Sequence, residues 1–268
     1  MIPGDFHTHT VYCDGKNTPY EMAEKALELG LTSIGFTGHG YTSKDDTFCM
    51  SKDNTARYIE EVLKLKSEYD GKIDILLGLE ADLHSEFDRS VYDYIIGSVH
   101  YFSYDGVKFD VDESIAQTKQ AIDYFGGVDE LAKVYYNEVK KLKPVTDCDI
   151  VGHFDILTKF NEREKLFDTE SNCYRELAID AVDTLLEYDV IFEVNTGAIT
   201  RGYRTTPYPD PFILNRIHEK GGSIILTSDA HSTNGICAYF DEALEIVKSV
   251  GFTSVKTITR NGFADIKI

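Results

Sequence analysis

Six short apolar runs along this chain each end in side chains that can bind a metal ion. These side chains are His7 with His9, His39, Glu80, His100, His153, and Asp229 with His231. Each run is typical of a β-strand, and in a parallel β/α barrel the C-terminal strand ends meet at one mouth. A single histidine at such a place is more often a hydrogen-bonded core residue. The coincidence of six endings favours an active site.

The spacing of these residues supports metal binding. His7 and His9 lie two residues apart, so on a strand both imidazoles point to one face and can hold one ion. Asp229 and His231 repeat this spacing. Glu80 follows an apolar strand, where an unpaired carboxylate is costly; a metal removes that cost, and an ion pair with arginine is the alternative.

Asp14 is a further candidate, although Asp-Gly is also a common turn. His84 and His218 do not follow a strand and are left outside the site. The candidate ligands are therefore nine: His7, His9, Asp14, His39, Glu80, His100, His153, Asp229 and His231.

One ion takes about four to six ligands, so two or three divalent ions are expected. Imidazole and carboxylate without thiolate suit zinc, iron or manganese. Such ions can share a bridging hydroxide and clamp a phosphoryl group, which predicts phosphate ester hydrolysis.

The elements that must position these side chains alternate between strand and helix. Strands are expected at 2–6, 33–38, 73–79, 94–99, 149–152, 190–194 and 223–227, with 255–259 as a further terminal strand, and helices at 19–29, 54–69, 112–124, 128–142, 171–188, 211–220 and 239–250. Thr18-Pro19-Tyr20-Glu21 is a capping box that begins the first helix, Gly126-Gly127 separates the third from the fourth, and Pro144 ends that insertion. No glycine-rich phosphate turn follows the first strand, so a barrel is favoured over an open doubly wound sheet.

Length and composition place limits on the function. A chain of 268 residues matches one α/β barrel, and residues 1–268 are expected to form a single domain. The net charge of −19 argues against nucleic acid as a partner but allows a small anionic substrate beside bound cations. Five scattered cysteines without a CxxC pair suit a reducing compartment. No membrane-spanning run or signal-peptide pattern is found, so no membrane partner and a cytoplasmic location are expected.

The motifs taken together resemble a known family. The segments His7-Thr8-His9, Gly38-His39, Gly78-Leu79-Glu80, Gly97-Ser98-Val99-His100, Gly152-His153 and Ser228-Asp229-Ala230-His231 resemble those of the PHP (polymerase and histidinol phosphatase) family. The whole chain is similar to the stand-alone histidinol-phosphate phosphatases of that family. The resemblance implies a distorted seven-stranded β/α (TIM-like) barrel with a trinuclear metal centre.

The resemblance also implies a ligand set for each ion. One ion would be held by His7, His9, Glu80 and Asp229, a second by Glu80, His100 and His153, and a third by His39 and His231. In the common family pattern another histidine often follows the first motif. Asp14 is the nearest candidate for that place here.

The implied reaction is hydrolysis of L-histidinol phosphate to L-histidinol and phosphate. A metal-bridging hydroxide would attack phosphorus in line, and Asp229 would orient or deprotonate it. His231 or a metal-bound water would protonate the leaving alkoxide. Arg163 and either Arg201 or Arg204 are expected to bind the phosphate, because guanidinium matches its geometry. Surface ion pairing with neighbouring carboxylates is the alternative for these arginines.

Three other functions fit parts of this pattern. A PHP-type phosphodiesterase or nucleotide phosphatase would use the same metals, although the net charge opposes long nucleic acid. A metal-dependent amidohydrolase also uses His-x-His on its first strand, but such enzymes often need a bridging lysine where this chain has His100. A non-catalytic metal-binding module is the remaining alternative.

Overall fold

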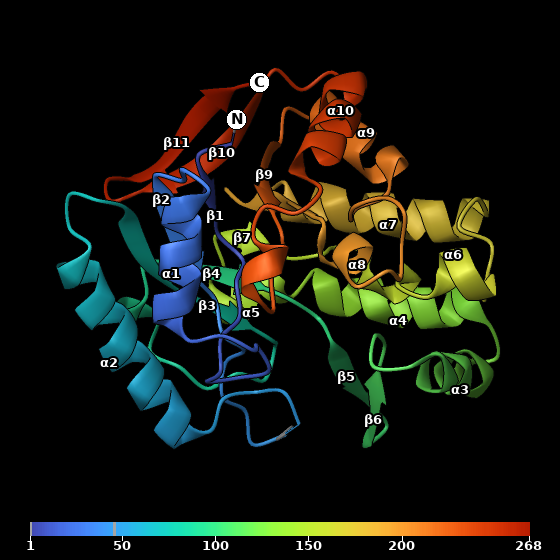
Figure 1. Ribbon diagram of the computed structural model, residues 1–268. Coiled ribbons are helices and arrows are strands. Elements are labelled where there is room, and N and C mark those ends of the chain that lie inside the picture. Colours follow the sequence, from blue (N-terminus) through green and yellow to red (C-terminus); the bar gives the residue numbers. More distant parts are fainter. Residues whose placement is uncertain (1, 45–46) are drawn as a thin grey trace.

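The computed structural model describes residues 2–44 and 47–268 and contains a curled, nine-stranded sheet (Figure 1). The spatial order of its strands is β1 (Gly4–Asp5), β2 (Ser33–Phe36), β3 (Asp74–Ala81), β4 (Tyr94–Gly97), β7 (Ile150–Val151), β8 (Ile191–Asn195), β9 (Ser223–Thr227), β10 (Ser254–Thr259) and β11 (Gly262–Lys267). Neighbours from β1 to β10 pair in parallel, and β11 is antiparallel to β10. The parallel strands therefore place their C-terminal ends at one edge.

The predicted α/β fold is confirmed, with a different strand count. The seven expected strands are all present among the nine of this sheet, the terminal strand is β10, and β11 was not anticipated. A parallel bridge joins Thr8, just after β1, to Ala230, just after β9. Around it, the Ala230 N–H donates to the His7 carbonyl (3.0 Å) and the His9 N–H donates to the Ala230 carbonyl (2.8 Å). The first and last motifs that the sequence predicts to bind metal are thereby held side by side.

Helices cover the outside of the sheet. They are α1 (Pro19–Glu28), α2 (Lys52–Glu68), α3 (Ile115–Phe125), α4 (Val128–Val139), α5 (Leu142–Thr146), α6 (Asn161–Glu164), α7 (Asn172–Leu185), α8 (Gly197–Thr200), α9 (Pro211–Glu219) and α10 (Phe240–Val250), with short 3₁₀ turns at η1 (Arg89–Val91), η2 (Ile156–Thr158) and η3 (Thr233–Gly235). The capping box is confirmed: Thr18 Oγ1 accepts from the Glu21 N–H, and the Glu21 carboxylate accepts from the Thr18 N–H. Among the described residues, no helix is both long and apolar enough to span a membrane.

The sheet separates two apolar layers. Side chains alternate along each strand, so one face packs under the helices and the other faces the inside of the curl. The inner cluster consists only of residues in or next to strands: Phe6, Leu76, Tyr94, Ile96, Ile150, Ile191, Ile225 and Ile258. The Tyr94 hydroxyl donates to the Phe6 carbonyl (2.7 Å), which ties β4 to the segment after β1 across this interior. The inner layer thus fills the interior of the curled sheet between its strands.

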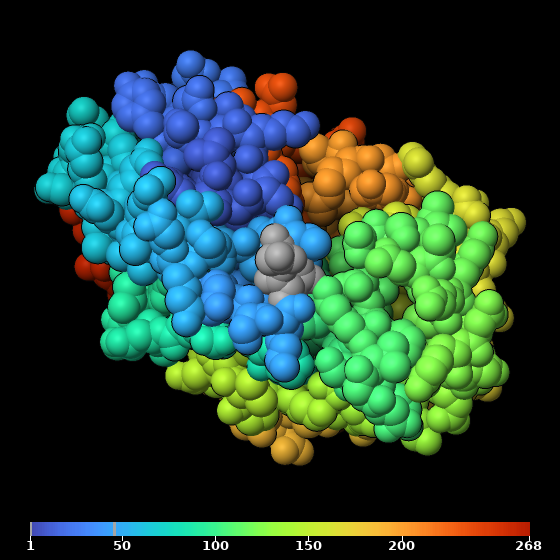
Figure 2. All heavy atoms as spheres, turned by 90° about the horizontal axis from the view of Figure 1, so that it is seen from below, coloured from blue at the N-terminus to red at the C-terminus, as the bar shows by residue number. Residues whose placement is uncertain are grey.

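An insertion between β4 and β7 carries elements of its own. It begins with an antiparallel hairpin, β5 (Tyr101–Tyr104) and β6 (Val107–Asp110), that the sequence interpretation missed. Asp105-Gly106 between these strands has positive φ at both residues and is the hairpin signal that was present in the sequence. The helices α3 and α4 then meet at Gly126-Gly127 as expected, whereas Pro144 lies inside the short helix α5 instead of ending the insertion. In Figure 2 the N-terminal segments (blue) and this insertion (green) form opposite sides of the visible face.

Candidate metal centre

The predicted ligands converge at the C-terminal edge of the parallel strands. Glu80 lies near the end of β3, and the histidines follow β1, β2, β4 and β7 within a few residues. Asp229 and His231 follow β9. A bridge between His39 and Glu80 continues the pairing of β2 with β3 beyond the end of β2. The topology therefore brings together residues that are more than two hundred positions apart in the sequence.

Glu80 lies at the centre of this group. Its Oε2 is 3.2 Å from His7 Nε2, 3.5 Å from His9 Nε2 and 3.0 Å from His39 Nδ1. Its Oε1 is 3.4 Å from His100 Nε2 and 2.9 Å from His153 Nε2. The two carboxylate oxygens thus face two different sets of imidazoles.

Asp229 completes the first set. Its Oδ1 is 3.2 Å from His9 Nε2 and 3.8 Å from His7 Nε2. Its Oδ2 accepts from Arg201 Nη2 (2.8 Å). One oxygen of this carboxylate therefore faces the imidazoles while the other is held by the guanidinium.

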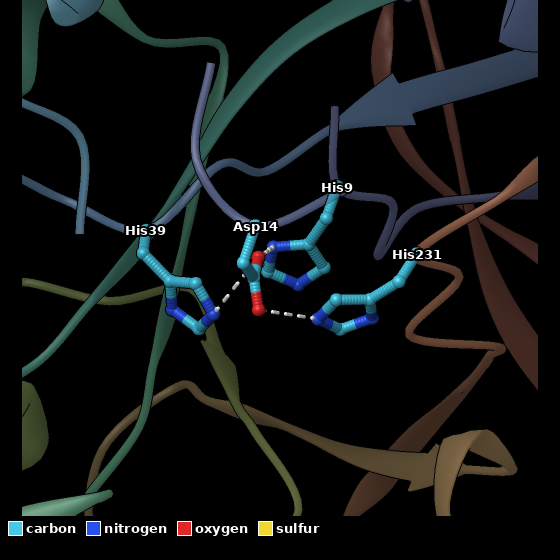
Figure 3. A group of neighbouring side chains, drawn as sticks. All are labelled: His9, Asp14, His39 and His231. Carbon is cyan, nitrogen blue, oxygen red and sulfur yellow. Dashed lines mark hydrogen bonds and ion pairs between the residues drawn. The ribbon is translucent and has the colours of Figure 1, made fainter. Parts of the chain in front are cut away.

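Asp14 lies close to the imidazoles of three histidines, as Figure 3 shows. Its Oδ2 is 2.9 Å from His231 Nε2, and its Oδ1 is 3.5 Å from His9 Nδ1 and 3.7 Å from His39 Nε2. The rings of His9 and His231 are stacked with centroids 4.2 Å apart. Asp14 thus lies among three predicted ligands even though it comes from a loop.

Orphaned buried atoms show that these residues fit metal ions. His7 Nε2, His9 Nε2, His39 Nδ1 and Glu80 Oε2 are buried and have no hydrogen-bond partner in the described part of the chain. A buried polar atom without a partner is costly. Two ligand atoms that bind one ion at about 2.1 Å in a tetrahedral arrangement lie about 3.4 Å apart, close to the separations around Glu80. Three overlapping sets, His9–Asp14–His39–His231, His7–His9–Asp229 and His39–Glu80–His100, have ligand atoms within 4.8 Å of one another.

The charges in the site favour anionic Glu80 and Asp229 and a neutral His9. Burial opposes protonation of His7 and His39, but the neighbouring carboxylates raise the pKa of both rings. Burial opposes ionisation of Glu80, but His7 and His39 hold its pKa well below the usual value. Burial likewise opposes ionisation of Asp229, and Arg201 lowers its pKa. Burial and the neighbouring His231 lower the pKa of His9 to about 3. Anionic carboxylates and a neutral imidazole are the forms that bind metal.

A cavity of about 240 Å³ opens beside these residues. Its wall consists of Asp14, His39, Phe48, His100, Asp110, Asp112, Glu113, His153, Ile156, Lys159, Arg201, Tyr203, Asp229 and His231. Lys159 and Arg201 supply positive charge near the predicted ligands, and the insertion adds Asp110, Asp112 and Glu113 to the acidic residues of the wall. The cavity can therefore hold a small molecule that carries both an anionic and a cationic group.

The three predicted phosphate-binding arginines lie in different surroundings. Arg201 lines the cavity and reaches Asp229 and His231 Nδ1 (3.2 Å). Arg204 is buried and lies outside the cavity wall, because its guanidinium is taken up by Asp210 and Thr158. Arg163 is exposed and also lies outside the wall. The structure brings only Arg201 to the predicted ligands.

Lys159 and Glu193 are among the residues of this region that sequence reasoning missed. Lys159 lines the cavity, and its Nζ donates to the Asp112 carboxylate (3.0 Å) and backbone carbonyl (2.7 Å). Glu193 is fully buried and its Oε1 is 2.5 Å from His7 Nδ1. The signal for Glu193 was a carboxylate within the apolar strand Ile191–Asn195, the same signal that identified Glu80. His84 and His218 do not line the cavity, in line with their exclusion.

Comparison with known proteins agrees with this geometry. The model of the PHP domain family matches residues 5–197. A protein of Deinococcus radiodurans described as a probable histidinol-phosphatase is 30% identical over 94% of this chain and 95% of its own length. The histidinol-phosphatase of Bacillus subtilis is 28% identical over 91% of this chain and 99% of its own.

A solved structure shows the same fold. The histidinol phosphate phosphatase of Lactococcus lactis, in complex with zinc, L-histidinol and phosphate, has a TM-score of 0.73 and 21% identity, with 98% of each chain covered. The ordered histidine and carboxylate motifs, their convergence at one sheet edge and the family match over residues 5–197 lead to one conclusion: this chain belongs to the PHP domain family.

Proposed function

We propose that this chain is a metal-dependent phosphomonoester hydrolase that converts L-histidinol phosphate to L-histidinol and phosphate. The observation that carries the proposal is the set of orphaned imidazole and carboxylate atoms around Glu80, next to a cavity with cationic and acidic sides. The histidinol-phosphatases similar in sequence, and the ligands in the Lactococcus lactis structure, support this substrate.

The proposed ligand sets follow the contacts in the site. The first ion would be held by His7, His9, Glu80 and Asp229, the second by Glu80, His100 and His153, and the third by Asp14, His39 and His231. When bound, zinc, iron or manganese ions supply Lewis acidity toward the phosphoryl oxygens and a nucleophile derived from water. Two or three ions are consistent with the number of donor atoms.

The phosphate group would be bound by Arg201 and Lys159, the basic side chains of the cavity wall. The guanidinium of Arg201 is already oriented by Asp229, and Lys159 is oriented by Asp112. Charge on the phosphoryl oxygens rises toward the transition state, so fixed cations at this place accelerate the reaction. We do not assign phosphate to Arg204 or Arg163, because neither lines the cavity.

The cationic part of the substrate would face the insertion. Glu113 lines the cavity on that side and can attract the amine and the imidazole ring. The neighbouring Asp110 and Asp112 also line it and pair with Lys108 and Lys159. Phe48 and Tyr203 add aromatic surface to the same wall. This acidic side distinguishes a zwitterionic substrate from a simple phosphate ester.

Asp229 would act on the nucleophile and His231 on the leaving group. Because the pKa of Asp229 is held well below its usual value, this carboxylate stays ionised and is a weak base, so it can orient the nucleophile by accepting a hydrogen bond from it. His231 is partly exposed at the cavity and close to Asp14, and it can deliver a proton to the leaving alkoxide only while its imidazole does not hold the third ion. Both roles lie on the side of the cavity formed by the segment after β9.

We further propose that residues 1–268 act as one domain, and that the strands from β1 to β9 in the main sheet form the distorted seven-stranded barrel that the sequence predicts. The bridge between Thr8 and Ala230 supports closure at the catalytic edge.

Hydrolysis of three substrates tests the proposed function, followed as inorganic phosphate for the monoester, p-nitrophenol for the bis-p-nitrophenyl ester and released nucleoside for the dinucleotide. The protein is loaded with zinc, iron or manganese and given L-histidinol phosphate, bis-p-nitrophenyl phosphate or a dinucleotide under identical conditions. We expect a marked preference for L-histidinol phosphate. Faster cleavage of the diester would contradict the substrate while leaving the metal site in place.

The variant Glu80→Gln tests the metal centre itself. The amide that replaces the carboxylate would lack the negative charge that faces two sets of imidazoles, so we expect loss of bound metal. We also expect kcat to fall at least about a hundred-fold, because one charge-assisted contact is lost at each set. Metal content is measured by elemental analysis beside turnover. Full activity in this variant would remove the bridging role of Glu80.

A further inference from the structure

Glu193 is a fully buried carboxylate that the proposed reaction does not use. It lies in β8 between Phe192 and Val194, which are also completely buried. An ionised carboxylate in such surroundings is costly unless its oxygens accept hydrogen bonds. Its partners therefore show what it is held there to do.

Both oxygens of Glu193 are occupied by donors, one from β8 itself and three from other strands or the segments that follow them. Oε1 is 2.5 Å from His7 Nδ1 and accepts from Thr227 Oγ1 (2.6 Å). Oε2 accepts from the backbone N–H of His153 (2.6 Å) and from Asn195 Nδ2 (3.0 Å). One side chain thus touches two predicted metal ligands that lie on opposite oxygens of Glu80.

The contact with His7 decides which ring nitrogen faces the site. With a hydrogen on Nδ1 that is donated to Glu193, the lone pair of His7 remains on Nε2. That atom is 3.2 Å from Glu80 Oε2 and has no hydrogen-bond partner among the residues that the structure describes. A carboxylate behind a histidine ligand sets its tautomer and its ring orientation.

We propose that Glu193 is the positioning residue of the metal centre: it holds His7 through Nδ1 and the His153 segment through its backbone amide. The inference rests on the proposed metal site and deepens it. Glu80 contacts the Nε2 atoms of the His7 and His153 rings, which face the proposed ions. Glu193 contacts the same two residues at other atoms, the Nδ1 of His7 and the backbone amide of His153.

The surroundings require a carboxylate at this position. All four neighbours donate, and the amide of Asn195 is fixed in direction because its Oδ1 accepts from the Gly197 N–H (2.8 Å). A glutamine would turn its own N–H groups either toward Asn195 and the His153 amide or toward His7. In the second case His7 would have to move its hydrogen to Nε2 and could no longer bind metal through that atom.

Zinc affinity of the full-length protein, measured by chelator competition, tests this role. We expect Glu193→Gln to weaken zinc binding about 10- to 100-fold. Thr227→Val removes one hydrogen bond to Glu193 without touching a ligand, and we expect about a 3-fold loss, close to the lower end for one net hydrogen bond. Thr257→Val in β10 is the matched control, because this buried hydroxyl has no hydrogen-bond partner among the described residues. We expect the control to bind zinc as the unmodified protein does.

The outcomes separate this inference from the proposed function. Unchanged zinc affinity in Glu193→Gln, with tight binding in the unmodified protein, would overturn the positioning role and leave the proposed function standing. If Glu193→Gln does not fold, Thr227→Val decides, and binding equal to that of Thr257→Val overturns the role. Absence of zinc binding in the unmodified protein would contradict both proposals.

Discussion

Asp229 has a left-handed backbone conformation (φ 49°), which is uncommon for a residue other than glycine. Such strained residues persist where surrounding contacts hold them, and here Arg201 binds both the side chain and the backbone carbonyl of Asp229. Gly197 makes this arrangement possible. A Cβ atom added there would lie 2.8 Å from Asp229 Cβ and 2.9 Å from Arg201 Nη2.

Gly197→Ala should therefore displace the Asp229 carboxylate. We expect metal affinity and kcat/KM to fall about ten-fold or more, because small displacements of catalytic groups are costly. Gly30→Ala is the control, since Gly30 has positive φ but no atom of the described residues within 4 Å of an added Cβ. It should lower stability without changing metal affinity. Equal metal affinity in the two variants would contradict the role of Gly197.

At the scale of elements, the short parallel strands deliver ligands only if the interior of the curl keeps its packing. Gly35 in β2 lies against Tyr94 of β4, where an added Cβ would be 2.0 Å from the Tyr94 hydroxyl oxygen. The close approach requires glycine. The relation between these two strands is thus set by one small and one large residue.

Gly35→Ala should destabilise the fold by overpacking, by about 1–3 kcal/mol. Tyr94→Phe removes the clashing oxygen at the cost of one hydrogen bond, about 1 kcal/mol. In the double variant, the loss measured by urea denaturation should be smaller than the sum of the two single losses. A sum that is simply additive would mean that the two residues do not compete for this space.

The insertion after β4 is the element that would select the substrate. Glu113 lines the cavity just before α3, so Glu113→Gln should raise KM for L-histidinol phosphate about ten-fold or more, the scale of a hydrogen bond to a charged group. The KM for p-nitrophenyl phosphate, which lacks the amine, should not change. Glu130→Gln on the exposed side of α4 is the matched control. Equal effects on both substrates would contradict a role in binding the cation.

At the scale of the whole molecule, the metal centre joins both ends of the chain. Residues of the first motif, the end of β3 and the segment after β9 meet at the same place. Bound ions that prefer the folded chain add stability by mass action, about 4 kcal/mol at a thousand-fold excess over Kd. The centre should therefore stabilise the global fold as well as the site.

Removal of metal by a chelator should lower the Tm by about 10 °C, given a shift of about 2–4 °C per kcal/mol for a chain of this size class. Differential scanning fluorimetry measures the shift, and readdition of zinc should restore it. An unchanged Tm after elemental analysis has shown complete metal loss would contradict this coupling between site and fold.

The sequence by itself determined the candidate ligands and the order of the elements that carry them. Apolar runs that end in histidine or carboxylate are local signals, and so are the capping box of Thr18 and the glycine pair that separates α3 from α4. The positions of His7, His39 and Glu80 at strand ends followed from these signals, because a strand is specified largely by its own residues. The same local signals were present, and overlooked, for the hairpin at Asp105-Gly106 and for Glu193.

Only the tertiary structure decided how side chains from separate loops pair. Arg201 and Arg204 are three residues apart in one loop, yet one lines the cavity beside Asp229 and the other is buried against Asp210. Lys159 reaches the cavity through Asp112, a partner from the insertion. Such choices depend on distances between segments far apart in the chain, and no local pattern carries them. The strand that was not anticipated, β11, is instead a local feature, because it pairs with β10 across a turn at residues 260–261.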